Sequence, residues 1–202
     1  AEGWGRRGGA RGDAGQRGKK SVGLDQGAPG DVVRLVALAQ TADVLLDNYP
    51  ADLLARRGLG WDRLHRANPR LIVTSVSCYG QTGPYADRPG SGTIAEGFAG
   101  LTGLTGWPEG KPMPPSTALG DILGANSAAM GILAALYWRD ANGGTGQQVD
   151  ASLFEPVLQA VSQAAGTWMP GAPPSRLGGK LPGHGLRNSY ATADGGHAVI
   201  ST

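Results

Sequence analysis

The segment 71–80, LIVTSVSCYG, constrains the fold more than any other part of the chain. It is rich in β-branched residues, almost unbroken in apolar character, and ended by Gly80. Runs of this kind are typical of parallel strands that are covered on both faces. The segment therefore predicts a buried strand with other elements packed on each side of it.

Helix-like and strand-like segments alternate around this strand. In the first of them, apolar residues recur at helical spacing, and two later segments end at Gly58 and before Pro69, which are helix stop signals. This alternation predicts an α/β fold with a mostly parallel sheet. The predicted helices are 31–43, one within 51–60 that is closed by Gly58, and one from 61 that is closed before Pro69; the predicted short strand is 44–48.

The second half of the chain continues the alternation after a Gly- and Pro-rich loop. Pro156 is predicted to open a helix, because proline is tolerated at the first helical position. Asp194-Gly195-Gly196 predicts the turn of a hairpin. The predicted elements are helices over 93–106, 118–140 and 156–168, a strand within 143–155, and a hairpin within 188–201.

Composition divides the chain into four parts. Residues 1–17 are rich in Gly and Arg with almost nothing to bury, which predicts disorder. The main α/β unit spans 18–168, a Pro/Gly-rich linker spans 169–187, and 188–202 begin a smaller second domain. The chain starts on Ala and ends inside a predicted strand, so we expect a fragment of a longer protein.

Charge and cysteine content limit the classes of function. The net charge of +2 implies no large basic surface, so nucleic acid is not the expected partner; RNA binding by the Gly/Arg-rich tail is a minor alternative. The single cysteine rules out an internal disulfide framework and suits a reducing cytosol, which predicts a cytoplasmic protein. No signal peptide is recognised.

The stretch 118–138 is the one transmembrane candidate in the sequence. It is apolar, but it includes Asp121, Asn126 and Ser127 and follows Pro114-Pro115. A buried helix of a soluble protein is therefore the favoured interpretation, and we expect no membrane partner.

Asp121 is the most informative residue of that stretch, because it is a carboxylate near the start of an apolar helix. One interpretation is an N-cap, whose side chain satisfies free N–H groups of the first turn. The other is functional: the helix dipole holds the carboxylate ionised, and Gly120 lets a ligand approach the backbone. Such a carboxylate is a competent nucleophile towards an activated acyl group.

Other chemically active residues carry weaker signals. Glu155 precedes Pro156 at a second strand-to-helix junction, where capping is favoured over function. Cys78 follows a strand with no histidine placed beside it, so a buried structural cysteine is favoured over a thiol catalyst. No CxxC, HExxH or acidic cluster indicates a metal, and no standard phosphate-binding glycine loop occurs.

The ordered motifs resemble the family III CoA-transferases, also called the CaiB/BaiF family. This family includes formyl-CoA transferase, carnitine CoA-transferase and alpha-methylacyl-CoA racemase. The resemblance covers about residues 17–202, and the order of the motifs is more specific than any one of them. They are RGKKSVGLD, ADVLLDNY, LLARRGLG, NPRLIVTSVSCYGQTGPYADRPG, LTGLTG, ALGD, GILAALYWRD, GGTGQQVDASLFE and LRNSYATADG.

The resemblance implies a Rossmann-like large domain, a smaller second domain and an interlocked homodimer. Family members are about twice as long as this chain, so 18–168 would be part of the CoA-binding large domain. The first strand-helix unit, most of the small domain and the returning C-terminal segment would be absent. The resemblance further implies coenzyme A thioesters and small carboxylic acids as substrates, with no separate cofactor and no metal.

By the same resemblance, Asp121 would be the nucleophile. It would attack an acyl-CoA thioester to give a mixed anhydride, then form an aspartyl-CoA thioester that passes CoA to an acceptor acid. The resemblance places CoA contacts at Asn48, Tyr49 and Arg56, and an apolar contact near the adenine at Leu24.

The chain also departs from the family pattern. A family lysine that helps to bind CoA falls at Gly27, and an active-site Tyr-Glu pair falls at Ser91 and Gly92. The racemase branch has a histidine at the Ser91 position, and serine is not an acid/base at neutral pH, so racemisation is the less favoured alternative. Glu96, one helical turn on, is a candidate replacement for the missing acid. A non-catalytic remnant is the third alternative.

Overall fold

The core of the chain is a parallel sheet of three strands in the order β1-β2-β3. The computed structural model describes residues 18–25, 27–167, 174–181 and 183–201. The strands are β1 (Val44–Asp47), β2 (Ile72–Ser77) and β3 (Gln148–Ser152). β2, the strand predicted from the apolar run, lies in the centre and pairs in parallel with both others. The predicted α/β class with a parallel sheet is confirmed.

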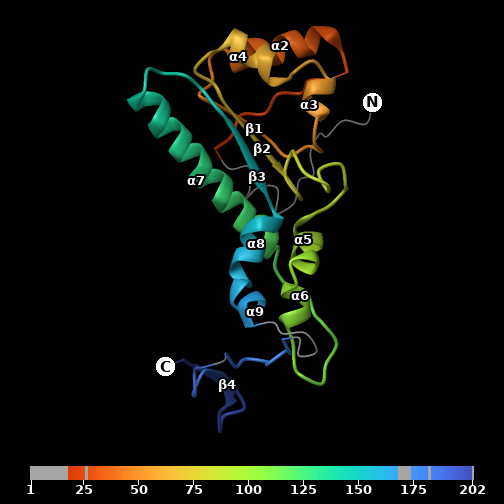
Figure 1. Cartoon of the computed structure of the whole chain (residues 1–202), viewed down its shortest axis with the longest axis vertical. Coiled ribbons are helices and arrows are strands. Elements are labelled where there is room, and N and C mark those ends of the chain that lie inside the picture. Colours follow the sequence, from red (N-terminus) through yellow and green to blue (C-terminus); the bar gives the residue numbers. More distant parts are fainter. Residues whose placement is uncertain (1–17, 26, 168–173, 182, 202) are drawn as a thin grey trace.

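Helices cover both faces of this sheet, as the composition of β2 predicts. On one face α2 (Pro29–Ala39) and α4 (Trp61–Ala67) pack against the strands, and α7 (Leu119–Ala141) covers the other face (Figure 1). Thr74 and Val149 are paired in register, so they point to the same face, and Gly131 of α7 lies against Val149 there. A side chain at Gly131 would keep α7 away from the sheet.

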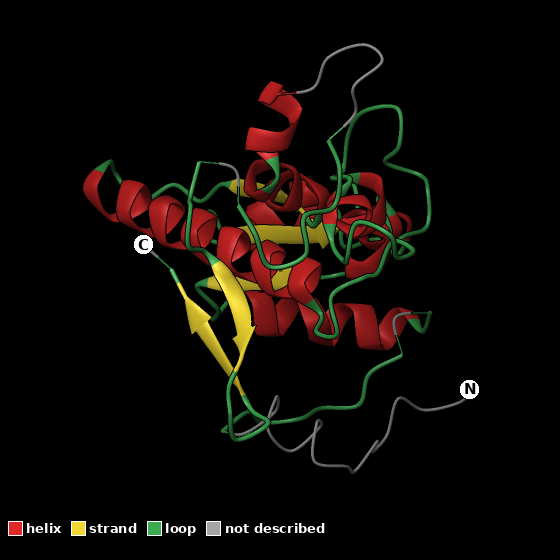
Figure 2. Cartoon of the chain, turned by 90° about the horizontal axis from the view of Figure 1, so that it is seen from below, coloured by secondary structure: helices red, strands yellow, loops and turns green. Residues whose placement is uncertain are grey.

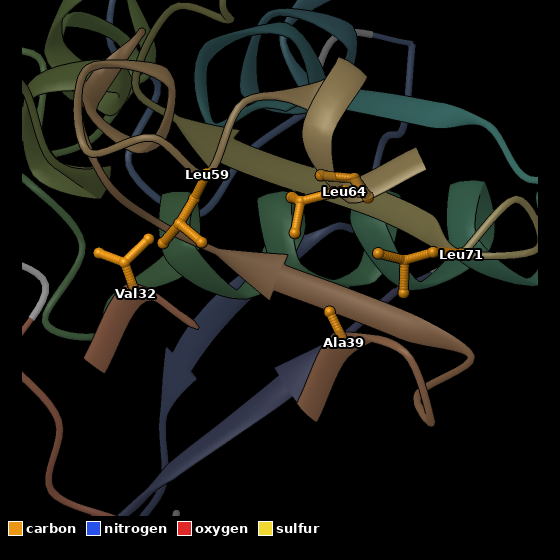
Figure 3. Close-up of a cluster of buried hydrophobic side chains, with 6 residues drawn as sticks. Val32, Ala39, Leu59, Leu64 and Leu71 are labelled. Atoms are coloured by element: carbon orange, nitrogen blue, oxygen red, sulfur yellow. The ribbon is translucent and has the colours of Figure 1, made fainter. Parts of the chain in front are cut away.

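The main hydrophobic cluster lies between α2, α4 and the sheet. Figure 3 shows side chains from α2, from the loop before α4, from α4 and from the start of β2 converging on one another. Burying each large aliphatic side chain contributes about 2 kcal/mol, so this cluster stabilises one half of the unit. Its buried members are Val32, Ala39, Leu59, Leu64, Leu71 and Val73.

Two predicted helices are each divided into two. The prediction over 93–106 becomes α5 (Gly92–Phe98) and α6 (Leu101–Leu104), because Gly100 has φ 90°, outside the helical region. The prediction over 156–168 becomes α8 (Phe154–Ala160) and α9 (Ser162–Thr167). Pro156 is the third residue of α8 rather than its first, so its predicted position was wrong by two residues.

The predicted helix over 51–60 is shortened to the single turn α3 (Leu53–Arg56). Asp52 precedes it with φ 60°, and Gly58 follows it with φ 74°. Two left-handed residues this close together leave room for one helical turn only.

The predicted hairpin is confirmed. β4 (Asn188–Ala191) and β5 (His197–Ile200) pair antiparallel, and Gly195 in their turn has φ 82°. Figure 2 shows the hairpin apart from the three-stranded sheet. In the described part of the predicted linker, Arg176 donates to the carbonyl oxygens of Trp107 and Gly110, at 3.2 and 2.5 Å.

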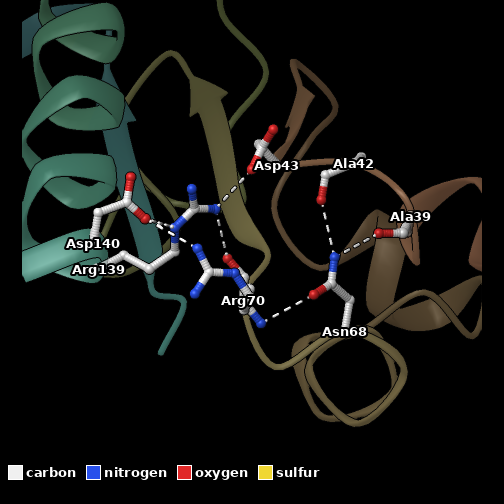
Figure 4. Close-up of polar contacts among 7 residues, drawn as sticks. All are labelled: Ala39, Ala42, Asp43, Asn68, Arg70, Arg139 and Asp140. Atoms are coloured by element: carbon white, nitrogen blue, oxygen red, sulfur yellow. Dashed lines mark hydrogen bonds and ion pairs between the residues drawn. The ribbon is translucent and has the colours of Figure 1, made fainter. Parts of the chain in front are cut away.

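A buried arginine fixes the C-terminal end of α7 (Figure 4). Arg139 is 4% exposed and pairs with Asp43 at 3.0 Å and with Asp140 at 2.9 Å. It also donates to the carbonyl oxygen of Arg70 at 3.1 Å. The hydrogen bond from Arg139 holds the pKa of the Asp140 carboxyl below its ordinary value. These contacts join α7 to the segments that enter β1 and β2.

α7 is long and apolar enough to cross a membrane by length and composition, a test that core helices of soluble proteins also pass. In the structure one side of α7 lies against β2, β3, α5 and α8. The expected buried helix is therefore only partly buried. Its exposed large apolar residues are Ile122, Met130, Leu133, Tyr137 and Trp138.

Candidate active site

The chemically active residues of the described chain gather where the parallel strands end. β2 and β3 finish in register at Ser77 and Ser152, and Cys78 follows β2 directly. The loop after β2 leads into α5, and α5 packs against the first turn of α7. In open parallel sheets ligands bind outside the carboxyl ends of the strands, which makes this edge the candidate active site.

Asp121 lies in the first turn of α7, at its third residue, with an exposed side chain. The helix begins at Leu119, and its N-cap is Ala118, which makes no capping hydrogen bond. The N-cap interpretation of Asp121 was therefore wrong, because the helix starts two residues before it. Within the described residues, the Asp121 carboxylate accepts no hydrogen bond.

Two glycines allow α5 and α7 to cross beside Asp121. A Cβ atom added to Gly92 would overlap the carboxylate of Asp121, and one added to Gly120 would lie 2.6 Å from the carbonyl oxygen of Gly92. Both positions therefore require glycine for this close approach. Gly92 was noted in the sequence only as a departure from the family pattern, and the structure gives its physical role.

Glu96 lies one turn after Gly92 on α5 and is completely buried. Its Oε1 accepts a hydrogen bond of 2.8 Å from the backbone N–H of Gly120, and its Oε2 has no partner among the described residues. Glu96 therefore satisfies a free N–H group of the first turn of α7. The spacing of four places Gly92 and Glu96 on one face of α5. Sequence analysis singled out Glu96 by this spacing but did not predict its hydrogen bond to α7.

Cys78 is buried next to these residues, and its thiol donates to the carbonyl oxygen of Ser91 at an S···O distance of 3.6 Å. Burial raises the pKa of the thiol, a hydrogen bond with Tyr79 partly opposes the shift, and the nearby Asp121 adds to it. A raised pKa keeps the thiol protonated and weakly nucleophilic. This agrees with a structural role for Cys78.

An aromatic cluster borders Cys78. Tyr79 contacts Phe98 edge-on at 5.3 Å between ring centroids, and Phe98 lies 5.1 Å from Phe154. At the opposite end of α5 from Gly92 is an apolar cavity of about 490 Å³. Its lining includes Ala99, Gly100, Leu104, Leu158 and Val161.

The four residues expected to contact CoA lie in neighbouring segments on the α3 side of the sheet. Asn48 and Tyr49 follow β1 directly, Arg56 is in α3, and all three are exposed. Leu24 is half-buried in the segment before α2. That segment meets the end of α3, because a Cβ at Gly27 would lie 3.1 Å from Nη1 of Arg57.

A cavity of about 310 Å³ with both polar and apolar lining opens beside α3, and none of the four expected CoA residues lines it. Asp47 accepts hydrogen bonds from the Ser75 hydroxyl at 2.7 Å and from the Tyr49 N–H at 3.1 Å. Asp150 accepts the N–H of Gln81 at 2.9 Å. The Asp47 carboxylate thus holds the end of β1, and the Asp150 carboxylate, in the middle of β3, holds the loop after β2.

The Ser152 hydroxyl, rather than the carboxylate of Glu155, accepts a backbone N–H at the start of α8. The N–H of Glu155 donates to the Ser152 hydroxyl at 3.0 Å, and that hydroxyl donates to Oε2 of Glu155 at 2.7 Å. Ser-x-x-Glu before a helix is a capping-box spacing, so both residues stabilise the start of α8. In the described part of the chain, no group of three His, Cys, Asp or Glu side chains could hold a metal ion.

Sequence comparison identifies the family. The profile of CoA-transferase family III matches residues 7–202. The chain belongs to CoA-transferase family III. The match begins ahead of residue 17, where the resemblance in the motifs starts, and so includes part of the Gly/Arg-rich segment that was expected not to match.

Curated relatives of this family III chain are named CoA-transferases. It is 38% identical over 185 residues to succinyl-CoA–D-citramalate CoA-transferase of Chloroflexus aurantiacus, covering 91% of this chain and 46% of the relative. It is 38% identical over 181 residues to succinate–glutarate CoA-transferase of Agrobacterium fabrum, covering 89% of this chain and 45% of that relative. The chain thus spans about half the length of these relatives.

The fold agrees with this assignment. A crystal structure of a CaiB/BaiF family protein from Brucella suis superposes with a TM-score of 0.81 at 30% sequence identity. The superposition covers 91% of this chain and 48% of that protein. The family III chain therefore has the α/β architecture of its relatives over the part that the two proteins share.

Proposed function

We propose that the protein transfers CoA between an acyl-CoA and a small carboxylic acid, with Asp121 as the nucleophile and an aspartyl-CoA thioester as intermediate. The observation that carries this proposal is the state of the Asp121 carboxylate, which is exposed at the start of α7 and accepts no hydrogen bond from the described residues. The helix dipole stabilises its negative charge.

The reaction needs no oxidant and no added cofactor. A carboxylate oxygen of Asp121 attacks the thioester carbonyl carbon, the C–S bond breaks, and CoA leaves as a thiolate with the electron pair. The thiolate attacks the Asp121 carbonyl of the mixed anhydride, which releases the donor's carboxylate and forms the aspartyl-CoA thioester. The acceptor carboxylate repeats the two exchanges in reverse, so the thioester bond is conserved.

CoA binding is proposed for Asn48, Tyr49, Arg56 and Leu24, which lie in adjoining segments. Arg57 joins them, because its guanidinium lies beside Gly27, where the family pattern has a lysine. A guanidinium suits phosphate oxygens at least as well as an ammonium group does. Arg57 therefore supplies a positive charge near the position where the family lysine would place one.

Racemisation is the second candidate, and Ser91 argues against it. Ser91 is the N-cap of α5, and its hydroxyl accepts the N–H of Ile94 at 3.5 Å. An N-cap serine in place of a histidine gives the site no second acid/base. We also propose that the protein acts in the cytoplasm, which the single cysteine favours, and as a homodimer, which the resemblance implies.

The relatives named for citramalate and glutarate suggest dicarboxylic acids as the first substrates to test. Wild type and Asp121→Asn would be incubated with succinyl-CoA and each acid, and the new thioester followed by mass spectrometry. We expect transfer in wild type and none above background in Asp121→Asn. Deuterium uptake at the α-carbon of a 2-methylacyl-CoA in D₂O, without transfer, would instead support the racemase.

A further inference from the structure

We propose that Glu96 is a positioning residue that keeps the Asp121 carboxylate free to react. Glu96 holds the N–H of Gly120, so that Asp121 does not turn back to cap its own helix. The inference rests on the proposed function, since a free Asp121 matters for catalysis only if Asp121 is the nucleophile.

The geometry of the α5–α7 crossing supports this role. Gly92 and Glu96 are four residues apart, so they lie on the same face of α5. Gly92 faces the Asp121 carboxylate, and Glu96 faces the N–H of the residue directly before Asp121. On this face of α5, Gly92 leaves space for the Asp121 carboxylate, and Glu96 accepts the Gly120 N–H that would otherwise attract that carboxylate.

Free N–H groups at the start of α7 can bind the Asp121 carboxylate and so compete with its reaction. An aspartate in the first turn of a helix is attracted to unpaired backbone N–H groups there. Ala118, the N-cap, has no side-chain oxygen to satisfy them. Instead, a carboxyl oxygen of Glu96, which belongs to α5, accepts the hydrogen bond from the Gly120 N–H.

The burial of Glu96 suggests that it is retained for function rather than for stability. The side chain is completely buried, and Oε2 has no partner among the described residues. A half-satisfied buried carboxyl is less favourable than a leucine of similar volume. Because Glu96 is bonded to the helix end, it acts on Asp121 through the backbone and does not replace the missing acid of the family's Tyr-Glu pair.

The test compares Glu96→Leu, which removes the acceptor, with Glu96→Gln, which keeps a carbonyl oxygen. Carboxylates would be labelled with a water-soluble carbodiimide and glycine ethyl ester and mapped by peptide mass, without any acyl-CoA. We expect Asp121 to be labelled in wild type and Glu96→Gln, and to be several-fold less labelled in Glu96→Leu. The control Glu155→Leu removes a carboxylate at the start of α8 and should leave Asp121 labelling unchanged.

A parallel arm would trap the acylated enzyme with hydroxylamine in the presence of acyl-CoA. We expect the trapping rate at Asp121 to fall about 100-fold in Glu96→Leu, with the KM for acyl-CoA unchanged and near-normal rates in Glu96→Gln. Circular dichroism would verify that each variant folds. Labelling of Asp121 in Glu96→Leu at the wild-type level overturns the inference, as does a loss of labelling in Glu96→Gln. If no acyl-CoA is trapped in wild type but the labelling contrast holds, Glu96 positions Asp121 and the proposed function fails.

Discussion

At the scale of single residues, Asp121 differs from the neighbouring carboxylates because it accepts no hydrogen bond from the described residues. Asp47, Asp150 and Glu155 each accept hydrogen bonds that brace a strand or a helix start. Glu96 is buried against the first turn of α7. Asp121 alone among these five has an exposed carboxylate without such a bond in the described chain, and this is why it is assigned the chemistry.

Gly92→Ala should remove transfer activity, because α5 and the first turn of α7 would have to move apart. The added methyl group would overlap the Asp121 carboxylate, and displacement of a reacting group by about 1 Å costs about 100-fold in rate. Transfer from succinyl-CoA would be measured beside Gly97→Ala, a control on the same helix whose added Cβ meets nothing within 4 Å. Gly97→Ala should keep full activity and raise the free energy of unfolding by about 0.5 kcal/mol. Equal activity of the two variants would contradict the crossing geometry.

Cys78 should react slowly with alkylating reagents in the folded protein. Burial raises the pKa of its thiol, so less thiolate is present at a given pH than for a free cysteine, whose pKa is about 8.5. The iodoacetamide rate would be followed against pH in native protein and in urea. The native midpoint should lie at higher pH than the unfolded one. A native midpoint at lower pH would make Cys78 an activated nucleophile.

At the scale of elements, α7 is fixed at both ends by residues from elsewhere in the sequence. Its N-terminal turn is held by Glu96 from α5, and its C-terminal turn by the pair of Arg139 with Asp43. A helix fixed in this way presents Asp121 at a constant position relative to the strand ends.

Arg139→Met should lower the free energy of unfolding by about 2 kcal/mol, because the carbonyl oxygen of Arg70 loses its donor and the carboxylates of Asp43 and Asp140 lose their buried cation. Urea denaturation would measure it against Arg34→Met, which loses only an exposed pair with Asp31 and should change stability by less than about 0.5 kcal/mol.

The pairing of Arg139 with Asp140 also predicts how the free energy of unfolding changes with pH. The pKa of Asp140 is lowered in the folded state, so its contribution to stability is present at neutral pH and is lost as pH falls below about 4. The stability difference between wild type and Arg139→Met should therefore narrow in acid. A difference that widens in acid would contradict the pairing.

The elements could be predicted from sequence to the extent that local signals decide them. The apolar run of β2 and the hairpin turn at Asp194-Gly195-Gly196 act locally, and both predictions are confirmed. The break at Gly100 and the one-turn length of α3 depend on left-handed backbone that the sequence pattern allowed but did not require. The hydrogen bond between Glu96 and Gly120 joins residues 24 apart in sequence, which no local pattern reveals.

At the scale of the whole molecule, the chain spans 46% of the length of its D-citramalate CoA-transferase relative. The order of motifs along the chain predicted the family, and the family profile confirmed it over residues 7–202. Which residues contact CoA stays a prediction, because Asn48, Tyr49 and Arg56 are exposed and their roles depend on a bound molecule.

The predicted homodimer can be tested directly on this chain. Sedimentation velocity should give a species of twice the mass of one chain, at a fraction that rises with protein concentration by mass action. A single species with the mass of one chain across the accessible concentration range would contradict homodimer formation by these 202 residues.

The central claim is that Asp121 becomes acylated, and trapping tests it most directly. The protein would be incubated with succinyl-CoA and hydroxylamine, and the modified residue identified by peptide mass. We predict a hydroxamate at Asp121 in wild type and none in Asp121→Asn. No hydroxamate in the wild-type chain, under conditions in which CoA is transferred, would contradict the covalent mechanism and leave Asp121 without the nucleophilic role assigned to it.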